Sequence, residues 1–285
     1  MTERKAKAIH VPKCKGHGAP GSSMLETMDE FLRFEHVHVA RGANVVLHDV
    51  NLRIAAGEHV AILGPNGCGK STLIKAMTCE CYPIPRAETR VSIFGRERWD
   101  LTQLKKKLGV VSAELPGRQT RTTTGEDAVL SGFFSSSTLW PNLTVTDAMR
   151  ARAEEVIRQV DAEHLRRKPV GEMSAGEQRR VMIGRALVQS ADMLLLDEPS
   201  NALDLSAQRE LRELLRKLAR GGVGILMITH HIADIIPEIE RVILMKSGRI
   251  HADGAKRELL TKERLSALFG VELEMSTREG FYDAW

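Results

Sequence analysis

A glycine-rich run that begins at residue 64 has the composition of a phosphate-binding loop. Glycines let the backbone curl so that successive N–H groups point inward, and a helix after the loop presents its positive end to an anion. Lys70 is placed to reach the β- and γ-phosphates of a nucleotide, and Ser71 to offer its hydroxyl to Mg²⁺. The run, which meets the spacing G-x-x-x-x-G-K-[ST], is Gly64, Pro65, Asn66, Gly67, Cys68, Gly69, Lys70, Ser71 and Thr72. An ordinary glycine-rich turn is the alternative, but the sequence favours an ATP site.

An acidic pair follows a short apolar run further along the chain. Met193 to Leu196 lead directly into Asp197 and Glu198. Such a run is typical of a buried parallel strand, and ligands in open α/β sheets bind at the carboxyl ends of strands. Asp197 is expected to hold Mg²⁺ through water, and Glu198 to orient or deprotonate the attacking water. An ordinary strand exit has the same composition, but the loop upstream favours a nucleotide-hydrolysing site.

A second anion site is predicted about twenty residues before Asp197. In Met173 to Arg180, Ser174 supplies a hydroxyl and Gly176 an unobstructed N–H at the start of a predicted helix. A plain helix start is compatible with the same residues. The segment resembles the Leu-Ser-Gly-Gly-Gln signature of ATP-binding-cassette (ABC) ATPases, with Met173 and Ala175 as departures. The resemblance spans nearly all of residues 31 to 260 and implies MgATP hydrolysis.

The resemblance also implies that two copies are needed. In this family the signature of one subunit caps the γ-phosphate on the loop of the other, so we expect a head-to-tail homodimer on ATP binding. Residues 200–204 resemble the family's D-loop. His230 stands where the family has its switch histidine, which would contact the γ-phosphate and hold Glu198 and the water; a satisfied surface histidine is the alternative. Together with Lys70 and Glu198, His230 completes the predicted catalytic set.

Two positions depart from the family pattern. The aromatic residue that stacks on adenine is replaced by Arg41, whose planar guanidinium can also stack on a base. Ala113 and Glu114 stand where the family has its Q-loop glutamine, and Glu114 or Gln119 is a potential substitute. Within the family, the sequence most resembles single-cassette proteins of the ModF-like group.

The elements that must position these residues alternate along the chain. Residues 31–39 and 50–55 alternate as antiparallel strands do, with Phe31, Arg33, Glu35, Val37 and Val39 assigned to one face. Buried strands are predicted at 59–63, 193–196, 224–229 and 241–245, a helix at 71–78, and a further strand pair at 90–94 and 108–112. The fold class is therefore α/β, a P-loop NTPase core of mixed sheet and helices with an antiparallel β subdomain and an inserted helical subdomain.

The chain divides into three parts on this basis. Residues 1–29 form a basic tail predicted to be disordered, 30–262 the ABC ATPase domain with its helical insertion at about 113–190, and 263–285 a C-terminal extension.

The net charge of +4 is mild, and no Lys/Arg stripe with interleaved aromatics indicates nucleic acid. The four cysteines, Cys14, Cys68, Cys79 and Cys81, do not form a zinc pattern and fit reduced thiols of the cytosol.

No apolar run is long enough to span a membrane. We therefore expect a cytoplasmic protein, peripheral to the inner face of the plasma membrane where a partner holds it. The leading hypothesis is the ATP-binding subunit of an ABC transport system with separate membrane-spanning chains. The alternatives are a soluble ABC ATPase switch acting on a protein or nucleic-acid target, and a module that closes on ATP without turnover. The presence of both Glu198 and His230 argues against the last.

Overall fold

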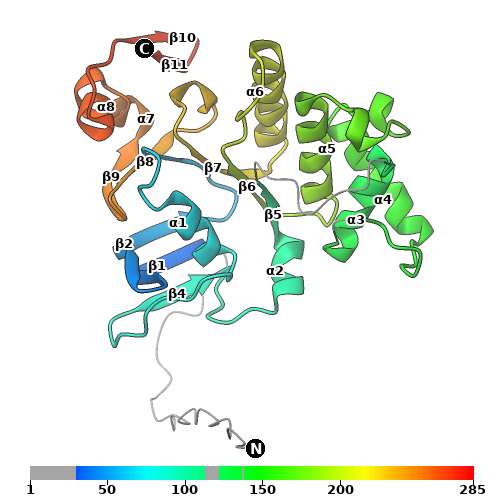
Figure 1. Cartoon of the computed structure of the whole chain (residues 1–285), viewed down its shortest axis with the longest axis horizontal. Coiled ribbons are helices and arrows are strands. Elements are labelled where there is room, and N and C mark those ends of the chain that lie inside the picture. The colour runs from blue at the N-terminus through cyan, green and yellow to red at the C-terminus, as the bar shows by residue number, and fades with distance from the viewer. Residues whose placement is uncertain (1–29, 113–121, 137) are drawn as a thin grey trace, which may run out of the picture.

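The computed structural model describes residues 30–112, 122–136 and 138–285 (Figure 1). The predicted tail 1–29 and the positions Ala113, Glu114 and Gln119 lie outside the described residues. The described residues form a six-stranded sheet, a three-stranded sheet and a two-stranded hairpin, together with helices. Among the described residues, no helix is long and apolar enough to cross a membrane.

The six-stranded sheet forms the centre of the molecule, in the order β5-β6-β7-β3-β8-β9. Its strands are β3 (His59–Leu63), β5 (Leu108–Val111), β6 (Met193–Asp197), β7 (Gly224–Thr229), β8 (Arg241–Lys246) and β9 (Arg249–Ala255). The first five strands in the sheet order pair in parallel, and β9 runs antiparallel to β8. The carboxyl ends of β3, β6 and β7 therefore meet at one edge, as the predicted site requires.

The antiparallel subdomain has the order β2-β1-β4, with β1 (Glu30–Arg41), β2 (Asn44–Ala55) and β4 (Arg90–Ile93). The predicted alternation through β1 is wrong. Phe31, Leu32 and Phe34 are buried together, and burial then resumes at Val37, because the strand bulges at His36, whose φ is +51°. The bulge exchanges the two faces of the strand.

The predicted pairing of 90–94 with 108–112 is also wrong. β4 pairs with β1 in the antiparallel sheet, whereas β5 pairs in parallel with β6. Helix α2 (Leu101–Lys107), capped by Asp100, carries the chain from one sheet to the other. Leu108, Gly109 and Val111 are buried. Burial of this kind is typical of a strand in a parallel sheet whose two faces are both covered by other elements.

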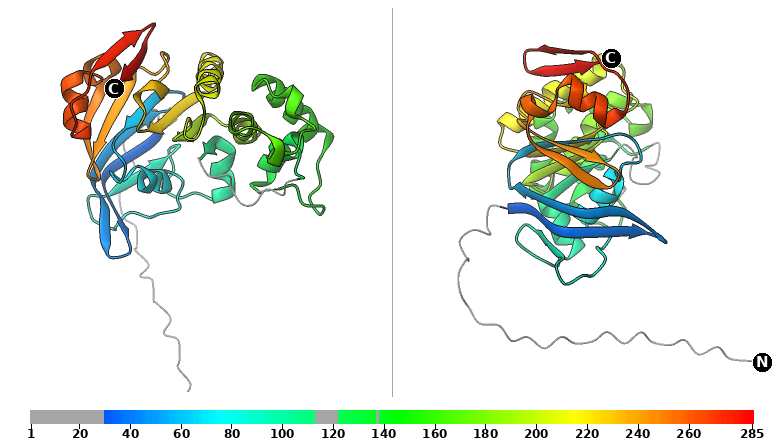
Figure 2. Two further views of the ribbon diagram at one scale, coloured as in Figure 1. Left: turned by 45° about the horizontal axis from the view of Figure 1, so that its top comes forward. Right: turned by 90° about the vertical axis from the view of Figure 1, so that its left-hand side faces the viewer.

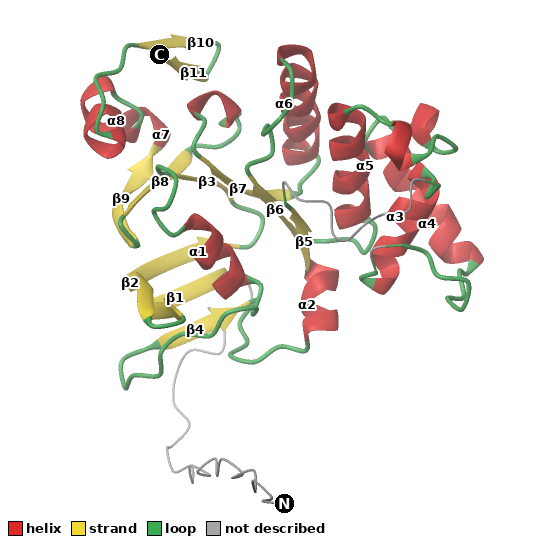
Figure 3. Ribbon diagram, viewed as in Figure 1, coloured by secondary structure: helices red, strands yellow, loops and turns green. Residues whose placement is uncertain are grey.

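Helices cover both sides of the central sheet, and a helical lobe extends from one end (Figures 2 and 3). The helices are α1 (Lys70–Met77), α3 (Gly125–Ser131), α4 (Asp147–Gln159), α5 (Ala175–Leu187), α6 (Leu205–Arg220), α7 (Lys256–Leu259) and α8 (Lys262–Phe269). Short 3₁₀ turns are η1 (Gly132–Phe134), η2 (Glu163–Leu165), η3 (Val170–Glu172) and η4 (Ile232–Asp234). The lobe comprises α3, α4 and α5, which pack on one another.

Two hydrophobic clusters lie on the two faces of the central sheet. Along β3, Val60 and Ile62 join the cluster under α1 and the antiparallel sheet, whereas Ala61 and Leu63 join the cluster under α6 and the lobe. This alternation follows from the period of two along a strand. The chain ends in a hairpin of β10 (Met275–Arg278) and β11 (Phe281–Ala284), which lies against η4.

Candidate active site

The glycine-rich loop joins the end of β3 to the start of α1, where sequence analysis placed it. Gly69 has a φ of +107°, a conformation that a side chain would strain. A Cβ on Gly64 would lie 2.3 Å from the carbonyl oxygen of Met245, and a Cβ on Gly69 would lie 3.1 Å from Leu47. Strands β8 and β2 therefore close on the loop so tightly that only glycine fits at Gly64.

Lys70 begins α1, and its side chain is 7 % exposed. Its Nζ donates to the carbonyl oxygens of Gly64 at 2.7 Å and Pro65 at 3.2 Å. It also lies 3.4 Å from Oε1 of Glu198. A buried lysine needs such partners, and all three of these are oxygens that an incoming phosphate can replace.

Glu198 follows the last residue of β6 in a left-handed conformation, with φ of +48°. Its N–H donates to the carbonyl of Ile228 in β7 at 2.8 Å, which fixes the turn beside the neighbouring strand. Its Oε2 lies 2.6 Å from Nδ1 of His230 and accepts the backbone N–H of the same residue at 3.3 Å. The ring contact is close but too bent for a straight hydrogen bond. The structure thus brings Lys70, Glu198 and His230 together.

The pKa values of the two carboxylates of the site are shifted in opposite directions. Burial alone would raise the pKa of Glu198, but the contacts with His230 and Lys70 bring that pKa below its usual value. Burial and the neighbouring Glu198 raise the pKa of Asp197, against the opposing charges of Lys70 and Arg179. Asp197 is therefore short of positive charge, whereas Glu198 is held ionised.

Two oxygen-bearing side chains of the site have the chemistry that suits Mg²⁺. The carboxylate of Asp197 and the exposed hydroxyl of Ser71 are hard oxygen ligands, which Mg²⁺ prefers. A divalent cation would also supply the charge that Asp197 lacks. Among the described residues, no group of three or more His, Cys, Asp or Glu is arranged to hold a metal.

Ser174 caps the start of α5 in the helical lobe. Its Oγ accepts the N–H of Glu177 at 3.2 Å, and Oε2 of Glu177 accepts the N–H of Ser174 at 2.7 Å, which completes a capping box. Lys168 holds Glu177 at 2.8 Å. A Cβ on Gly176 would lie 2.9 Å from Cβ of Ala207, so glycine lets the starts of α5 and α6 approach closely. Among the interactions of the described residues, none joins Ser174 or Gly176 to the glycine-rich loop.

Arg41 ends β1 and is exposed, opposite Asn44 at the start of β2. Three residues further along β2, Leu47 reaches Gly69. At about 3.3 Å per residue, Arg41 stands about 10 Å along the strand from the loop. The structure records no contact between Arg41 and the loop residues, so its role in base stacking stays a prediction.

Sequence reasoning missed several residues that shape the site. Arg179, on the second turn of α5, is buried, and its Nη1 donates to the carbonyl of Ser112 at 2.8 Å. Asp234 of η4 is buried and accepts the hydroxyl of Thr229 at 2.8 Å. His231 donates its N–H to the same hydroxyl at 2.9 Å, and its ring lies 3.8 Å from that of His230. A charged residue among apolar neighbours was the signal available for Asp234, whereas Arg179 stands between Gln178 and Arg180 and gave no such signal.

Comparison with known proteins gives a consistent result. Residues 47–201 match the family model described as ABC transporter. The chain is 31 % identical over 238 residues to the hemin import ATP-binding protein HmuV of Aliivibrio fischeri, covering 80 % of this chain and 86 % of that protein. It is 35 % identical to an uncharacterized ABC transporter ATP-binding protein of Methanocaldococcus jannaschii, covering 85 % and 82 % of the two chains.

Solved structures agree with these relatives. The cbiO1 protein of Clostridium perfringens, part of the ABC transporter complex cbiONQ, superposes with a TM-score of 0.71 at 28 % identity, over 84 % of this chain and 94 % of that one. A dimeric bacterial ABC transporter cassette superposes with a TM-score of 0.64 at 27 % identity, over 79 % and 98 % of the two chains.

Proposed function

The chain belongs to the ABC transporter family of ATP-binding proteins, and from this membership we propose that it hydrolyses MgATP at sites shared between two copies. The predicted fold class and the family resemblance are confirmed. The observation that carries the proposal is the meeting of Lys70, Glu198 and His230 beside the glycine-rich loop, at the ends of β3, β6 and β7. The narrower likeness to ModF-like proteins stays a prediction.

Binding of the triphosphate would rearrange the contacts of Lys70. Its ammonium exchanges the carbonyls of Gly64 and Pro65 for the β- and γ-phosphates, which are stronger charged acceptors. The N–H groups of the loop and of the first turn of α1 surround the same phosphates. Mg²⁺ held by Ser71 and Asp197 would neutralise charge that develops on the phosphates. Arg41 stacks on the base.

Glu198 then acts on the attacking water. Its low pKa keeps the carboxylate ionised at neutral pH, so it can accept a proton or orient the water by a hydrogen bond. His230 fixes the carboxylate from the end of β7, since Oε2 lies between its ring and its backbone N–H. The departure of Lys70 toward the phosphates frees Oε1 for the water.

The second half of each site would come from another copy. Each chain carries one glycine-rich loop and one signature, and the signature stands on the helical lobe with its capping box satisfied within α5. The start of α5 presents a hydroxyl and the positive end of a helix, which suits a γ-phosphate. A head-to-tail pair places each signature on the other chain's nucleotide and closes two equivalent sites.

Mixing two inactive variants tests this arrangement. Lys70→Ala removes the phosphate ligand, and Ser174→Arg blocks the signature. In a mixed dimer, the intact loop of the Ser174→Arg chain faces the intact signature of the Lys70→Ala chain, so one complete site forms. We expect each variant alone to release no phosphate, and an equal mixture to recover about a quarter of the wild-type rate, because half of the dimers hold one of two sites. A mixture that stays inactive contradicts the head-to-tail model.

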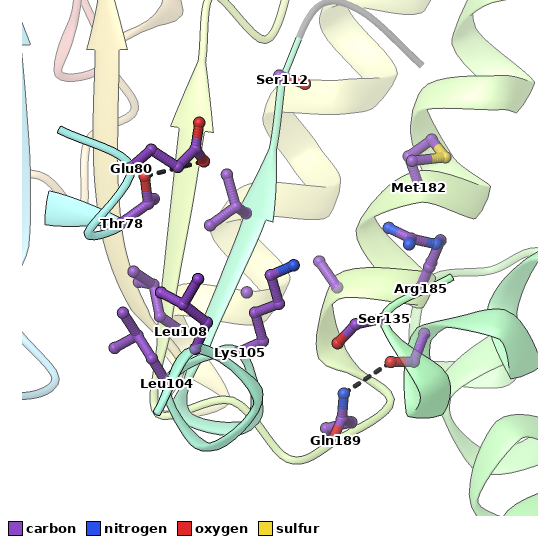
Figure 4. Close-up of a pocket in the computed structure, with 15 residues that line it drawn as sticks. Thr78, Glu80, Leu104, Lys105, Leu108, Ser112, Ser135, Met182, Arg185 and Gln189 are labelled. Atoms are coloured by element: carbon purple, nitrogen blue, oxygen red, sulfur yellow. Dashed lines mark hydrogen bonds between the residues drawn. The ribbon is translucent and has the colours of Figure 1, made fainter. Parts of the chain in front are cut away.

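A groove between the core sheet and the helical lobe is the proposed contact for a membrane-spanning partner (Figure 4). Its volume is about 320 Å³, with Leu104, Lys105 and Leu108 on one side and Met182 and Arg185 of α5 on the other. The walls are mainly apolar and also carry Glu80, so Lys105 is the cation that suits an acidic side chain of an amphipathic partner segment. Because the groove bridges β5 and α5, lobe movement on ATP binding would reach the partner.

The relatives' names support uptake as the direction of transport. Hemin, cobalt and zinc appear in the names of similar ATP-binding proteins. We propose import of a metal ion or metal chelate through separate membrane chains, which would hold this protein at the inner face of the plasma membrane. Lys105→Glu should then abolish stimulation of ATP turnover by the membrane partner and leave the basal rate unchanged.

A further inference from the structure

The C-terminal hairpin packs on α6 through an aromatic side chain. The ring centroid of Phe281 in β11 lies 5.9 Å from the guanidinium carbon of Arg212 and 5.5 Å from that of Arg216. A guanidinium near an aromatic ring is attracted by the negative charge on the ring face. Phe281 is also one of the partly buried apolar side chains packed against the hydrophobic cluster under α6 and the lobe. The hairpin is therefore attached to α6 rather than standing free.

Arg212 extends this attachment to the segment after His230. Its Nη1 donates to the carbonyl of Ala233 in η4 at 3.2 Å. η4 is a single 3₁₀ turn of three residues, with poor internal hydrogen-bond geometry, so its position depends on contacts from outside. β11 itself also packs on η4.

η4 in turn is tied to the proposed catalytic pair. Asp234 is 4 % exposed and accepts the hydroxyl proton of Thr229 at 2.8 Å. The oxygen of Thr229 accepts the N–H of His231 and lies 3.4 Å from Oε2 of Glu198. A displacement of η4 would thus move the end of β7, where His230 meets Glu198.

The hairpin is anchored at its turn as well. Nζ of Lys256, itself 8 % exposed, lies 3.4 Å from the carbonyl of Gly280 and 3.2 Å from the carbonyl of Ile236. Its ammonium lies 5.7 Å from the ring centroid of Tyr282. Lys256 therefore joins the hairpin to the chain that follows η4, so the segment from His230 to Ile236 is held at both ends.

We infer that the C-terminal hairpin positions Glu198 and His230 for catalysis, through Phe281, Arg212 and η4. The inference rests on the proposed ATPase function. The hairpin acts at a distance, because a cavity of about 270 Å³ lies between Asp283 and Ala284 on its side and His230 and His231 on the other. Phe281 is thus a positioning residue, whose effect on the catalytic carboxylate passes through Arg212 and η4.

Substitution of Phe281 tests the inference. In Phe281→Ala, we expect kcat for ATP to fall about tenfold, because a small misplacement of catalytic groups is costly, while KM stays within about twofold of wild type. Phe281→Tyr keeps the ring and should restore kcat. Thr277→Ala, exposed on the same hairpin, is the matched control and should match wild type. A Phe281→Ala enzyme with wild-type kcat, or one that Tyr does not rescue, overturns the inference.

Hydrogen exchange on the same proteins separates this inference from the proposed function. Amides of residues 228–236 should exchange faster in Phe281→Ala than in wild type and Thr277→Ala, and this readout needs no turnover. Unchanged exchange overturns the positioning role whether or not the wild type hydrolyses ATP. A wild type that binds ATP without releasing phosphate overturns the proposed function instead.

Discussion

Removal of the His230 ring is the perturbation whose consequence follows most directly from the geometry. The imidazole lies 2.6 Å from Oε2 of Glu198, and both side chains are largely buried, with exposed fractions of 28 % and 16 %. A carboxylate can only accept, so Nδ1 is the atom of this contact that would donate. A contact that is bent in the ligand-free site can straighten into a hydrogen bond in the transition state, where a hydrogen bond to a charged group contributes about 1.5–3 kcal/mol. If the whole of this free energy stabilises the transition state, His230→Ala lowers kcat by about 10- to 150-fold.

The same substitution should change the pH profile. Without the ring, burial raises the pKa of Glu198 against fewer opposing contacts. Because the carboxylate must be ionised to accept a proton, the acid limb of the kcat profile should move to higher pH.

The assay is steady-state phosphate release across pH, with the KM for ATP measured in parallel. His230→Gln keeps a donor and should recover part of kcat. His251→Ala is the control, because that histidine is exposed on β9; it should stay within about twofold of wild type. A His230→Ala enzyme with wild-type kcat and an unmoved acid limb would refute the reasoning.

Three further predictions concern the nucleotide site. Gly64→Ala places a Cβ 2.3 Å from the carbonyl oxygen of Met245 and should lower the free energy of unfolding, measured by urea titration, by about 1–3 kcal/mol. Gly254→Ala is the control, because a Cβ there has no neighbour nearer than 3.9 Å, and it should change the free energy of unfolding little. Arg41→Ala should weaken ATP binding by about 2- to 30-fold in a fluorescent-nucleotide titration and Arg41→Tyr should restore it, and equal affinity in all three proteins would exclude stacking. Because burial raises the pKa of Asp197, protons should compete with Mg²⁺ at a higher pH than they would at an exposed aspartate. The Mg²⁺ concentration that gives half-maximal turnover should therefore fall as pH rises through that pKa. Identical Mg²⁺ titrations across pH would contradict this.

Local sequence signals predicted the elements around the site closely. The apolar run at 59–63 matches β3, and 193–196 matches β6 to within one residue. Such strands are short, continuous and bounded by glycines or charges, so no tertiary information is needed to find them. The helix after the glycine-rich loop was predicted at 71–78, because no helix breaker follows the loop there, and the structure has it at Lys70–Met77.

Features that depend on distant contacts were not predicted. The bulge at His36 reverses the faces of β1, and alternation along one strand carries no sign of it. Residues 90–94 and 108–112 both resemble strands, but their partners are decided by which face needs covering. The docking of the C-terminal hairpin on η4 joins segments far apart in sequence, so the extension 263–285 gave no indication of it.

Nor could sequence disclose the contacts that tune the site. The approach of Lys70 to Glu198 joins the first residue of α1 to the residue that follows β6. The motifs identified each residue type, whereas the opposite pKa shifts of Asp197 and Glu198 depend on burial and on neighbouring charges.

The central claim, that two copies close head to tail on ATP, is tested most directly by the molar mass of Glu198→Gln in solution. Light scattering with and without saturating MgATP is compared with the wild type, while phosphate release is recorded. Glu198→Gln keeps the side-chain size but cannot accept the proton, so we predict a monomer without ATP and a stable dimer with it, beside a wild type that turns over. A Glu198→Gln protein that binds ATP and stays monomeric would contradict the account.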